Sequence, residues 1–310
     1  MTRTMPILRL GTRRSPLAMA QAEEARARLC AAHSWPQAAV ELVPVIASGD
    51  KVQDRPLSEI GGKALWTREL DGWLGEGRID AAVHSMKDVE TLRPPELAIG
   101  AVLPRADRRD VLVGAASIAS IGQGARLGTS APRRAAQMRH LRADLEVVLF
   151  RGNVATRIAK LAAGEADVTL LAKAGLDRLG EQGVGTPLEP DDFLPASAQG
   201  AIGLECRSSD QRALELIAAI DHAPSRAEVM AERALLAALD GTCHSPVAVD
   251  CRWREDGSLF MRAALFSPGG AERVAGERVL AVGDMEAVTS LAADLLARAG
   301  PATQAVFRTS

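Results

Sequence analysis

The hydrophobic residues of the N-terminal third of the chain form short runs separated by amphipathic stretches of helical length. The runs that predict strands lie at residues 7–10, 40–46, 81–84 and 97–103. Ser15 and Pro16 favour the start of a helix that continues to about residue 32, since Ser is a preferred N-cap and Pro suits the first turn. A second helix is predicted at residues 63–74. The polar stretch between is a predicted long loop, and we consider residues 48–62 a candidate lid.

The same alternation resumes after a charged stretch at residues 104–110, which predicts a crossing into a second domain. The strands predicted beyond it lie at residues 125–128, 147–150, 168–171 and 201–205, and the helices at 132–141, 154–163, 173–179, 210–220 and 225–239. From residue 246 the pattern changes to strands at 247–253, 259–265 and 278–282 and one helix at 285–299. The pattern is typical of an α/β fold with parallel strands, followed by a small α+β C-terminal domain.

Length and charge limit the class of protein. A chain of 310 residues exceeds what one hydrophobic core usually serves, so two or three domains are expected. The net charge of -2 gives no indication of a nucleic-acid partner. No segment approaches the roughly 20 apolar residues of a membrane span, and residues 1–10 do not resemble a signal peptide. We therefore expect a cytoplasmic protein that binds neither membrane nor nucleic acid.

Cysteine and histidine are sparse. The four cysteines, at positions 30, 206, 243 and 251, form no CxxC pair, and we expect free thiols. The five histidines have none of the paired spacings of a zinc site, so no metal is expected. Arginine, in contrast, makes up 32 of the 37 basic residues. A coding bias that favours Arg throughout the chain explains most of them. Only their location relative to the predicted strands and helices indicates which ones bind anions.

Four predicted strand ends combine cations with hydroxyl or amide side chains. These groups are Arg13 with Ser15; Ser85 with Lys87; Thr129 and Ser130 with Arg133 and Arg134; and Asn153 with Arg151 and Arg157. A helix N-terminus exposes unpaired N–H groups and the positive end of the helix dipole, so added cations there favour anion binding over helix stability. We expect the Ser, Thr and Asn residues to cap their helices in either case, and the alternative is that they do nothing more. In open α/β sheets the carboxyl ends of the strands face the binding crevice, so the four groups could converge on one ligand.

Two single residues are candidates for chemistry. Asp88 is the one acid among these cations, where its carboxylate should stay ionised and could stabilise a cationic intermediate or accept a proton. Alternatively, it only complements a helix dipole. His84 is interpreted as a packed strand residue. Cys243 lies in a turn between a predicted helix and strand, where an accessible thiol could act as a nucleophile. The alternative, a small buried hydrophobic residue, describes the other three cysteines well.

Several motifs together resemble the porphobilinogen deaminase family over nearly the whole chain. They are GTRRSPLA at 11–18, GGKALW at 61–66, HSMKDV at 84–89, GTS at 128–130, Arg133 with Arg134, LFRGNV at 149–154, QGA at 199–201 and GTC at 241–243. The resemblance implies two periplasmic-binding-protein-like α/β domains plus a small α+β C-terminal domain. It places residues 1–103 with 202–221 in domain 1, 104–201 in domain 2 and 222–310 in domain 3, and it implies a monomer.

The resemblance also implies the chemistry. Porphobilinogen would lose ammonia and be polymerised head to tail into the linear tetrapyrrole hydroxymethylbilane. The primer would be a dipyrromethane cofactor joined by a thioether to Cys243, and Asp88 would be catalytic. The implied cofactor-binding residues are Cys243, Ser85, Lys87, Asp88, Thr129, Ser130, Arg133, Arg134 and Arg151. The implied substrate-binding residues are Arg13, Ser15, Gln21, Arg151 and Arg157.

Six positions depart from the usual family pattern without removing a group that the chemistry needs: Glu59, Trp66, Ala131, Pro132, Ala155 and Thr242. A rival interpretation is a non-catalytic solute-binding protein or sensor domain of the same two-lobed architecture. Such a protein would bind a dicarboxylate but would require neither Cys243 nor Asp88.

Overall fold

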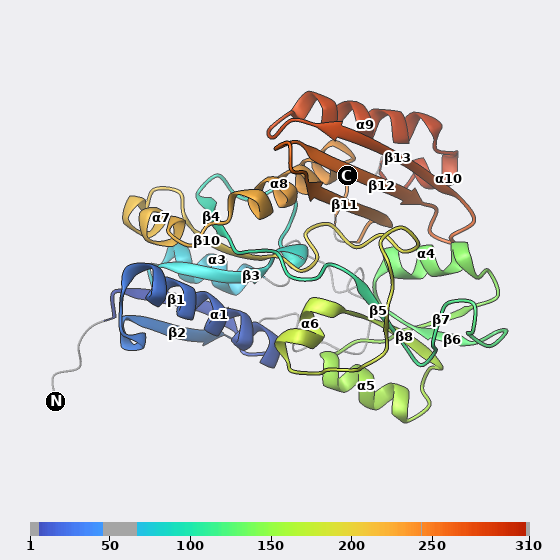
Figure 1. Ribbon diagram of the computed structural model, residues 1–310, viewed down its shortest axis with the longest axis horizontal. Helices are drawn as coiled ribbons and strands as arrows, with labels where there is room; N and C mark the ends of the chain where they lie inside the picture. Colours follow the sequence, from blue (N-terminus) through green and yellow to red (C-terminus); the bar gives the residue numbers. More distant parts are fainter. Residues whose placement is uncertain (1–5, 46–66, 243, 308–310) are drawn as a thin grey trace. The chain divides into compact units, whose positions relative to one another are not determined.

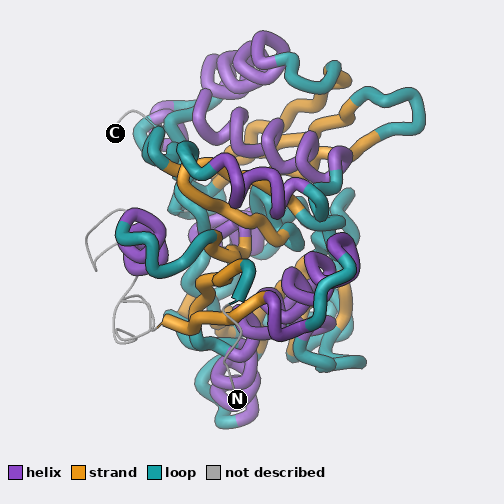
Figure 2. The backbone as a smooth tube through the Cα atoms, turned by 90° about the vertical axis from the view of Figure 1, so that its left-hand side faces the viewer, coloured by secondary structure: helices purple, strands orange, loops and turns teal. Residues whose placement is uncertain are grey.

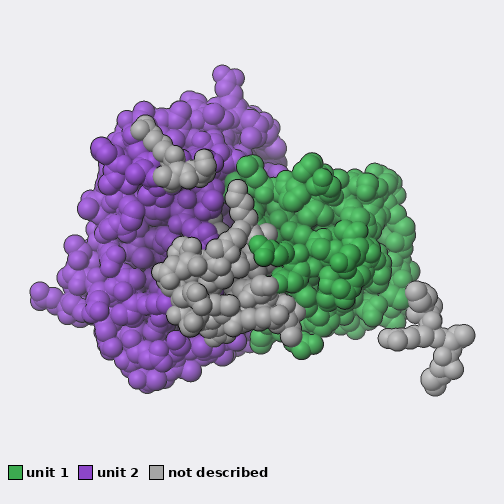
Figure 3. Space-filling view, turned by 180° about the vertical axis from the view of Figure 1, so that it is seen from behind, with its two compact units in different colours: residues 1–52, 62–106, 201–226 green, residues 53–61, 107–200, 227–310 purple. Residues whose placement is uncertain are grey.

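The computed structural model describes residues 6–45, 67–242 and 244–307 (Figure 1). The chain divides into two compact units, each of which is built from separate stretches of sequence (Figure 3). Unit 1 contains residues 1–52, 62–106 and 201–226, and unit 2 contains residues 53–61, 107–200 and 227–310. The candidate lid, 48–62, lies outside the described residues, as do Glu59, Trp66 and Cys243.

In the described part of unit 1, five strands form one sheet in the order β2-β1-β3-β10-β4. Their bounds are β1 (Leu8–Arg13), β2 (Val40–Val45), β3 (Ala81–Ser85), β4 (Leu97–Val102) and β10 (Ile202–Arg207). Strand β1 runs parallel to β2 and β3, as predicted. The prediction of parallel pairing is wrong for β10, which runs antiparallel to both β3 and β4. An antiparallel strand needs no crossover helix, so the chain can return to unit 1 directly.

Helix α1 (Pro16–His33) packs on the sheet of unit 1 and begins at the predicted residue. Its buried side chains are mostly small, and with Leu29 they cover Leu8 and Leu10 of β1. The other helices in the described part of this unit are α3 (Arg68–Gly75), α7 (Gln211–Ala218), the single 3-10 turns η1 (Gln37–Ala39) and η3 (Met86–Asp88), and the start of α8 (Ala223–Ala238). The sheet and α1 thus form a rigid support for the residues at the carboxyl ends of β1 and β3.

Unit 2 contains a second sheet, in which five described strands have the order β7-β6-β8-β5-β9. Their bounds are β5 (Asp110–Val113), β6 (Arg126–Gly128), β7 (Glu146–Val148), β8 (Val168–Ala172) and β9 (Thr186–Pro187), and the helices are α4 (Pro132–Leu141), α5 (Val154–Ala162) and α6 (Lys173–Arg178). The strand β5 was missed because its four residues follow a charged stretch directly. It runs antiparallel to β8 and lies between β8 and β9 in the sheet.

A third, antiparallel sheet follows in unit 2, with the order β11-β12-β13. It comprises β11 (Val247–Trp253), β12 (Leu259–Phe266) and β13 (Arg273–Leu280), and it is accompanied by α9 (Met285–Arg298) and α10 (Pro301–Gln304). The strand predicted at 278–282 corresponds to β13, which begins and ends earlier in the sequence than predicted. Val279 and Val282 made the later range look buried, but each is 51% exposed, whereas Val274 and Leu280 lie in the core.

The described helices and strands confirm a mixed α/β fold with a small α+β part at the C-terminal end (Figure 2). In the residues that the structure describes, no helix is long and apolar enough to cross a membrane.

Candidate functional site

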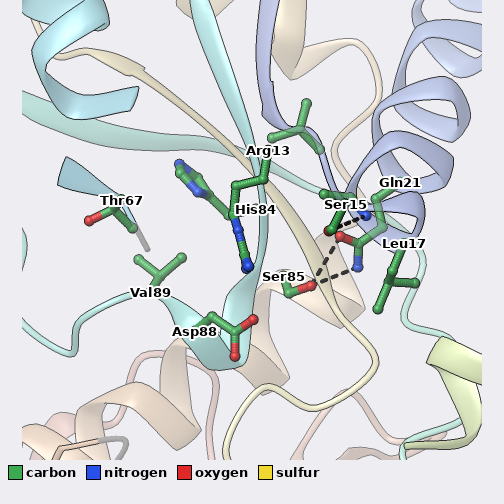
Figure 4. Close-up of a pocket in the computed structure, with 11 residues that line it drawn as sticks. Arg13, Ser15, Leu17, Gln21, Thr67, His84, Ser85, Asp88 and Val89 are labelled. Atoms are coloured by element: carbon green, nitrogen blue, oxygen red, sulfur yellow. Dashed lines mark hydrogen bonds between the residues drawn. The ribbon is translucent and has the colours of Figure 1, made fainter. Parts of the chain in front are cut away.

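A pocket in unit 1 collects residues from the ends of β1 and β3 and from the first turns of α1 (Figure 4). It is lined by Arg13, Ser15, Leu17, Ala18, Gln21, Thr67, Val83, His84, Ser85, Asp88 and Val89. Five of the candidate residues from the sequence, Arg13, Ser15, Gln21, Ser85 and Asp88, therefore lie together, although up to 75 positions separate them in the chain. Thr67 was missed, because no motif marks it.

The start of α1 forms one wall of this pocket. Ser15 has extended backbone angles and its hydroxyl accepts a hydrogen bond from the Ala18 N–H at 3.4 Å, which confirms the predicted N-cap. Arg13 is the last residue of β1. The first turn of α1 contains no acidic residue that would neutralise the helix dipole. This corner of the pocket thus combines a guanidinium, a hydroxyl and a helix N-terminus, a combination that suits a carboxylate ligand.

Gln21 and Ser85 connect α1 to the end of β3. The Ser85 hydroxyl oxygen lies 2.8 Å from Gln21 Nε2 and 3.0 Å from Gln21 Oε1 (Figure 4). Gln21 is 5% exposed. Ser85 does not cap the turn that follows it, so the expectation that it is a capping residue is wrong. Its hydroxyl is instead held at the pocket wall by the Gln21 amide.

Asp88 ends the single 3-10 turn η3 and lines the pocket. A strand-to-helix junction was expected here, but no α-helix follows β3. A turn of three residues has almost no macrodipole, so the alternative role of complementing a helix dipole does not explain this carboxylate. Lys87 lies in the same turn but is not among the residues that line the pocket. His84 is 6% exposed, and its Nε2 lies 3.5 Å from Glu205 Oε2, as expected of a packed strand residue.

Unit 2 holds the second set of candidate residues, at the start of α4. Arg133 and Arg134 are each 5% exposed and share one carboxylate, that of the fully buried Asp110. Arg134 Nη2 lies 2.6 Å from Asp110 Oδ1, and Arg133 Nη2 lies 2.8 Å from Asp110 Oδ2. Burial lowers the pKa of Arg133. Asp110 was not predicted as a site residue, because nothing in the local sequence indicates that the first residue of β5 faces α4.

The cap of α4 differs from the prediction. Its N-cap residue is Ala131, which makes no side-chain cap, and Pro132 occupies the first helical position. The hydroxyl of Thr129 accepts a hydrogen bond from the Ala131 N–H at 3.2 Å. The expectation that Thr129 or Ser130 caps this helix is therefore wrong.

The start of α5 lies beside the start of α4, since the backbone of Thr129 pairs with Val148 and Phe150 on the neighbouring segment. Asn153 is the N-cap of α5 and accepts a hydrogen bond from the Thr156 N–H at 2.9 Å, as predicted. Arg151 is 6% exposed.

Gly152 lies between Arg151 and Asn153. Its φ of 114° is a conformation that favours glycine. Arg157 Nε donates to the Gly152 carbonyl oxygen at 3.1 Å. The chain path around Arg151 is thus fixed by a glycine, a helix cap and the side chain of Arg157.

The donor set of unit 2 fits an organic polycarboxylate. Two buried guanidinium groups share one carboxylate, so this cluster carries an excess of positive charge, and two helix N-termini adjoin it. No group of three or more His, Cys, Asp or Glu side chains that could hold a metal ion occurs among the described residues.

Cys243 itself lies outside the described residues, so only its flanks are visible in the structure. They lie between α8 and β11, where the Thr242 N–H donates to Ser245 Oγ at 3.1 Å and the His244 N–H donates to Thr242 Oγ1 at 3.1 Å. Burial lowers the pKa of His244. The other three cysteines are buried free thiols, as expected.

Comparisons with known proteins cover nearly the whole chain. Residues 8–215 match the family model "Porphobilinogen deaminase, dipyromethane cofactor binding domain", and residues 226–297 match "Porphobilinogen deaminase, C-terminal domain". The porphobilinogen deaminase of Sphingopyxis alaskensis is 57% identical over 307 residues, which is 97% of each chain. That of Paracoccus denitrificans is 49% identical over 296 residues, 94% of each chain.

Among solved structures, the periplasmic aliphatic sulphonate binding protein SsuA from Escherichia coli matches 74% of this chain and 69% of its own. Its identity is 14% and its TM-score 0.39, too low to assign a common fold. The family models and the two close relatives, in contrast, agree with each other and with the motifs. This chain belongs to the porphobilinogen deaminase family.

Proposed function

We propose that this chain is a transferase that deaminates porphobilinogen and joins four pyrroles head to tail into hydroxymethylbilane. The observation that carries the proposal is the pocket of unit 1, in which the Asp88 carboxylate lies with Arg13, Ser15 and Ser85. A reaction with cationic intermediates and carboxylated substrates needs one carboxylate near the reacting centre and several donors around it.

Asp88 acts on the reacting pyrrole. When the substrate loses ammonia, positive charge develops on its ring and methylene carbon, and a nearby carboxylate stabilises that charge. The same carboxylate accepts hydrogen bonds from pyrrole N–H groups and orients the ring. The short turn that carries Asp88 supports this role, because it leaves the carboxylate directed at the pocket without a helix dipole to neutralise.

The cationic residues bind the acetate and propionate side chains of the pyrroles. In unit 1 these are Arg13 and Lys87, assisted by Ser15, Ser85 and Gln21. In unit 2 they are Arg133, Arg134, Arg151 and Arg157, assisted by Thr129 and Ser130. Asp110 keeps two of these guanidinium groups in place and leaves their joint positive charge incompletely neutralised, which favours an incoming carboxylate.

The dipyrromethane cofactor named by the family model supplies a free pyrrole α-carbon, to which new units are added. We propose that Cys243 holds it through a thioether and that the guanidinium groups of unit 2 bind its carboxylates. The flanking residues Thr242, His244 and Ser245 lie between α8 and β11, which supports an attachment point outside the regular helices and strands.

We also propose the wider setting that the resemblance implies. The three sheets support a division into domain 1 (1–103 with 202–221), domain 2 (104–201) and domain 3 (222–310). The protein is proposed to act as a monomer in the cytoplasm, with porphobilinogen as its small-molecule partner and with no metal, nucleic acid or membrane.

The intact mass of the purified chain tests this function. We expect the wild-type chain to be heavier than its sequence by one dipyrromethane and to consume porphobilinogen with release of ammonia. Cys243→Ser should lose both the added mass and the turnover. Cys30→Ser, which replaces a buried thiol, is the matched control and should keep both.

A wild-type chain of unmodified mass that binds dicarboxylates without turnover would contradict the proposed enzyme. That outcome would favour the solute-binding alternative.

A further inference from the structure

We propose that Arg93 is a positioning residue, which fixes the turn that carries Asp88 by tying Glu90 to β10, an interior strand of the sheet. This inference rests on the proposed function, because it concerns the carboxylate that we place next to the reacting pyrrole. Arg93 belongs to none of the motifs quoted above, and it does not line the pocket.

The guanidinium of Arg93 joins three separate segments of unit 1. It forms a two-pronged pair with Glu205 of β10, with Nε at 2.8 Å from Oε1 and Nη2 at 2.7 Å from Oε2. Nη2 also donates to Asp71 Oδ1 of α3 at 2.6 Å. Nη1 donates to Glu90 Oε2 at 2.7 Å. With only 8% of its side chain exposed, Arg93 is a buried connector rather than a surface cation.

Through Thr67 the same network reaches the pocket wall. Thr67 lines the pocket, is 1% exposed and donates from Oγ1 to Glu90 Oε2 at 2.9 Å. Arg93 Nη1 lies 3.2 Å from the same hydroxyl oxygen. Arg93 therefore holds both a residue that lines the pocket and the carboxylate two positions after Asp88.

Strand β10 fixes the turn from both sides. On the near side, the Met86 N–H donates to the Ala201 carbonyl oxygen at 3.1 Å, and the Met86 side chain packs against Gly203. A Cβ at Gly203 would lie 2.1 Å from Met86 Sδ, so a larger residue there would force the Met86 side chain to move. On the far side, Arg93 ties Glu90 to Glu205. Asp88 thus lies between two attachments, one to Ala201 and Gly203 at the start of β10 and the other to Glu205 farther along this strand.

The charges around Arg93 show why its removal or displacement would destabilise this part of unit 1. Three carboxylates surround this one guanidinium, and Glu205 is 1% exposed. Burial disfavours the ionised form of Glu205, but His84 and Arg93 outweigh it and lower the pKa of Glu205 to about 2. His84 Nε2 is 3.5 Å away, so Arg93 provides the short bonds. Burial raises the pKa of Asp71 in spite of its bond to Arg93.

Lysine could not replace this connector. Its ammonium is a point charge, whereas the planar guanidinium satisfies Glu205 through two parallel bonds and still donates to Asp71 and Glu90. Arg93→Lys therefore keeps the charge of the network and loses its geometry.

The most specific test removes the ion pair between Glu90 and Arg93 and leaves the other ion pairs of Arg93 in place. Glu90→Ala removes the link from the turn to Arg93, while Arg93 keeps Asp71 and Glu205. Because small displacements of a catalytic group are costly, we expect kcat to fall roughly 10- to 100-fold. KM should stay within about twofold, since the carboxylate-binding residues are untouched. Hydrogen exchange at residues 86–89 should become faster.

Asp80→Ala is the matched control. It removes a partly buried ion pair of the same unit, in which Arg9 Nη2 lies 2.7 Å from Asp80 Oδ1, without touching residues 86–93. We expect it to lower stability but to leave kcat and the exchange at residues 86–89 unchanged. Arg93→Lys should reproduce the selective fall in kcat and serves as the deciding variant if Glu90→Ala does not fold.

Wild-type kcat in a folded Glu90→Ala chain would overturn the inference. So would a fall in kcat that Asp80→Ala matches, since that would indicate a loss of general stability. Failure of the proposed function is a separate result, because it would appear in the wild-type chain as a missing primer mass and no turnover. The exchange rates at residues 86–89 report on positioning even in that case.

Discussion

At the scale of single residues, the structure separates Asp88 from four other acids of unit 1. Glu205, Asp71 and Glu90 are bound to Arg93, and Asp80 is bound to Arg9. Asp88 instead lines the pocket beside Ser85 and His84. A carboxylate with a structural partner contributes to folding, whereas one that lines a pocket can serve a ligand.

Asp88→Asn should therefore nearly abolish turnover. The amide keeps the size of the side chain but lacks the negative charge that stabilises a cationic intermediate, and we expect kcat to fall by at least about 100-fold. Steady-state rates with porphobilinogen would measure this loss, and circular dichroism would show an unchanged fold. A variant that turns over at the wild-type rate would exclude Asp88 from the chemistry.

At the scale of elements, α4 lacks a side-chain cap. Its N-cap residue, Ala131, has the extended backbone of a capping position but no side-chain acceptor. The neighbouring helices α1 and α5 are capped by Ser15 and Asn153. The difference is local, so it can be tested by one substitution.

Ala131→Ser should stabilise the protein. A serine hydroxyl at this N-cap can accept an N–H bond from the first turn of α4, which is worth about 0.5 to 2 kcal/mol of unfolding free energy. Urea denaturation compared with the wild type would measure the gain. Asn153→Ala is the reciprocal variant and should lose a similar amount. An unchanged midpoint for Ala131→Ser would mean that Thr129, which accepts the Ala131 N–H, already fixes this end of the helix.

At the scale of the whole molecule, stability depends on a few buried ion pairs. Glu205 with Arg93 in unit 1 and Asp110 with Arg133 and Arg134 in unit 2 each lie in the interior. Removing one partner of such a pair leaves an uncompensated buried charge, which costs about 3 to 5 kcal/mol. Each pair also makes stability depend on pH wherever folding shifts the pKa of a partner.

Glu205 sets the expected acid response of unit 1. Its pKa is about 2 in the fold, against 4.5 for an exposed glutamate, so the unfolded chain takes up the proton first as the pH falls. The stabilisation from its ionised form should be complete above about pH 4.5 and be lost progressively towards pH 2.

Denaturation curves at several pH values, followed by tryptophan fluorescence, would measure this response. In Glu205→Gln the unfolding free energy should be lower at neutral pH and should fall less steeply between pH 4.5 and pH 2. Equal slopes for variant and wild type over that range would show that other groups control the acid response.

Interactions between residues that are close in the sequence account for many of the helices, strands and helix caps. The start of α1 at Pro16, the full extents of α4 and β11, and the caps by Ser15 and Asn153 follow from neighbouring residues and from hydrophobic period. Such features depend on contacts between residues a few positions apart, so they can be predicted from the order of the residues in the sequence. The family was also predictable, because its motifs are short and keep their order along the chain.

Tertiary structure alone decided the long-range pairings. Arg93 meets Glu205 across 112 positions, and Arg134 meets Asp110 across 24, and no local pattern indicates either pair. The antiparallel direction of β10 likewise follows from the way the chain returns to unit 1. The amino-acid sequence by itself thus determined most of the helices and strands, the motifs and the residues available for chemistry. Which charges are buried against each other, and which remain at a pocket, was decided only when distant segments packed together, because burial is a property of the folded surroundings.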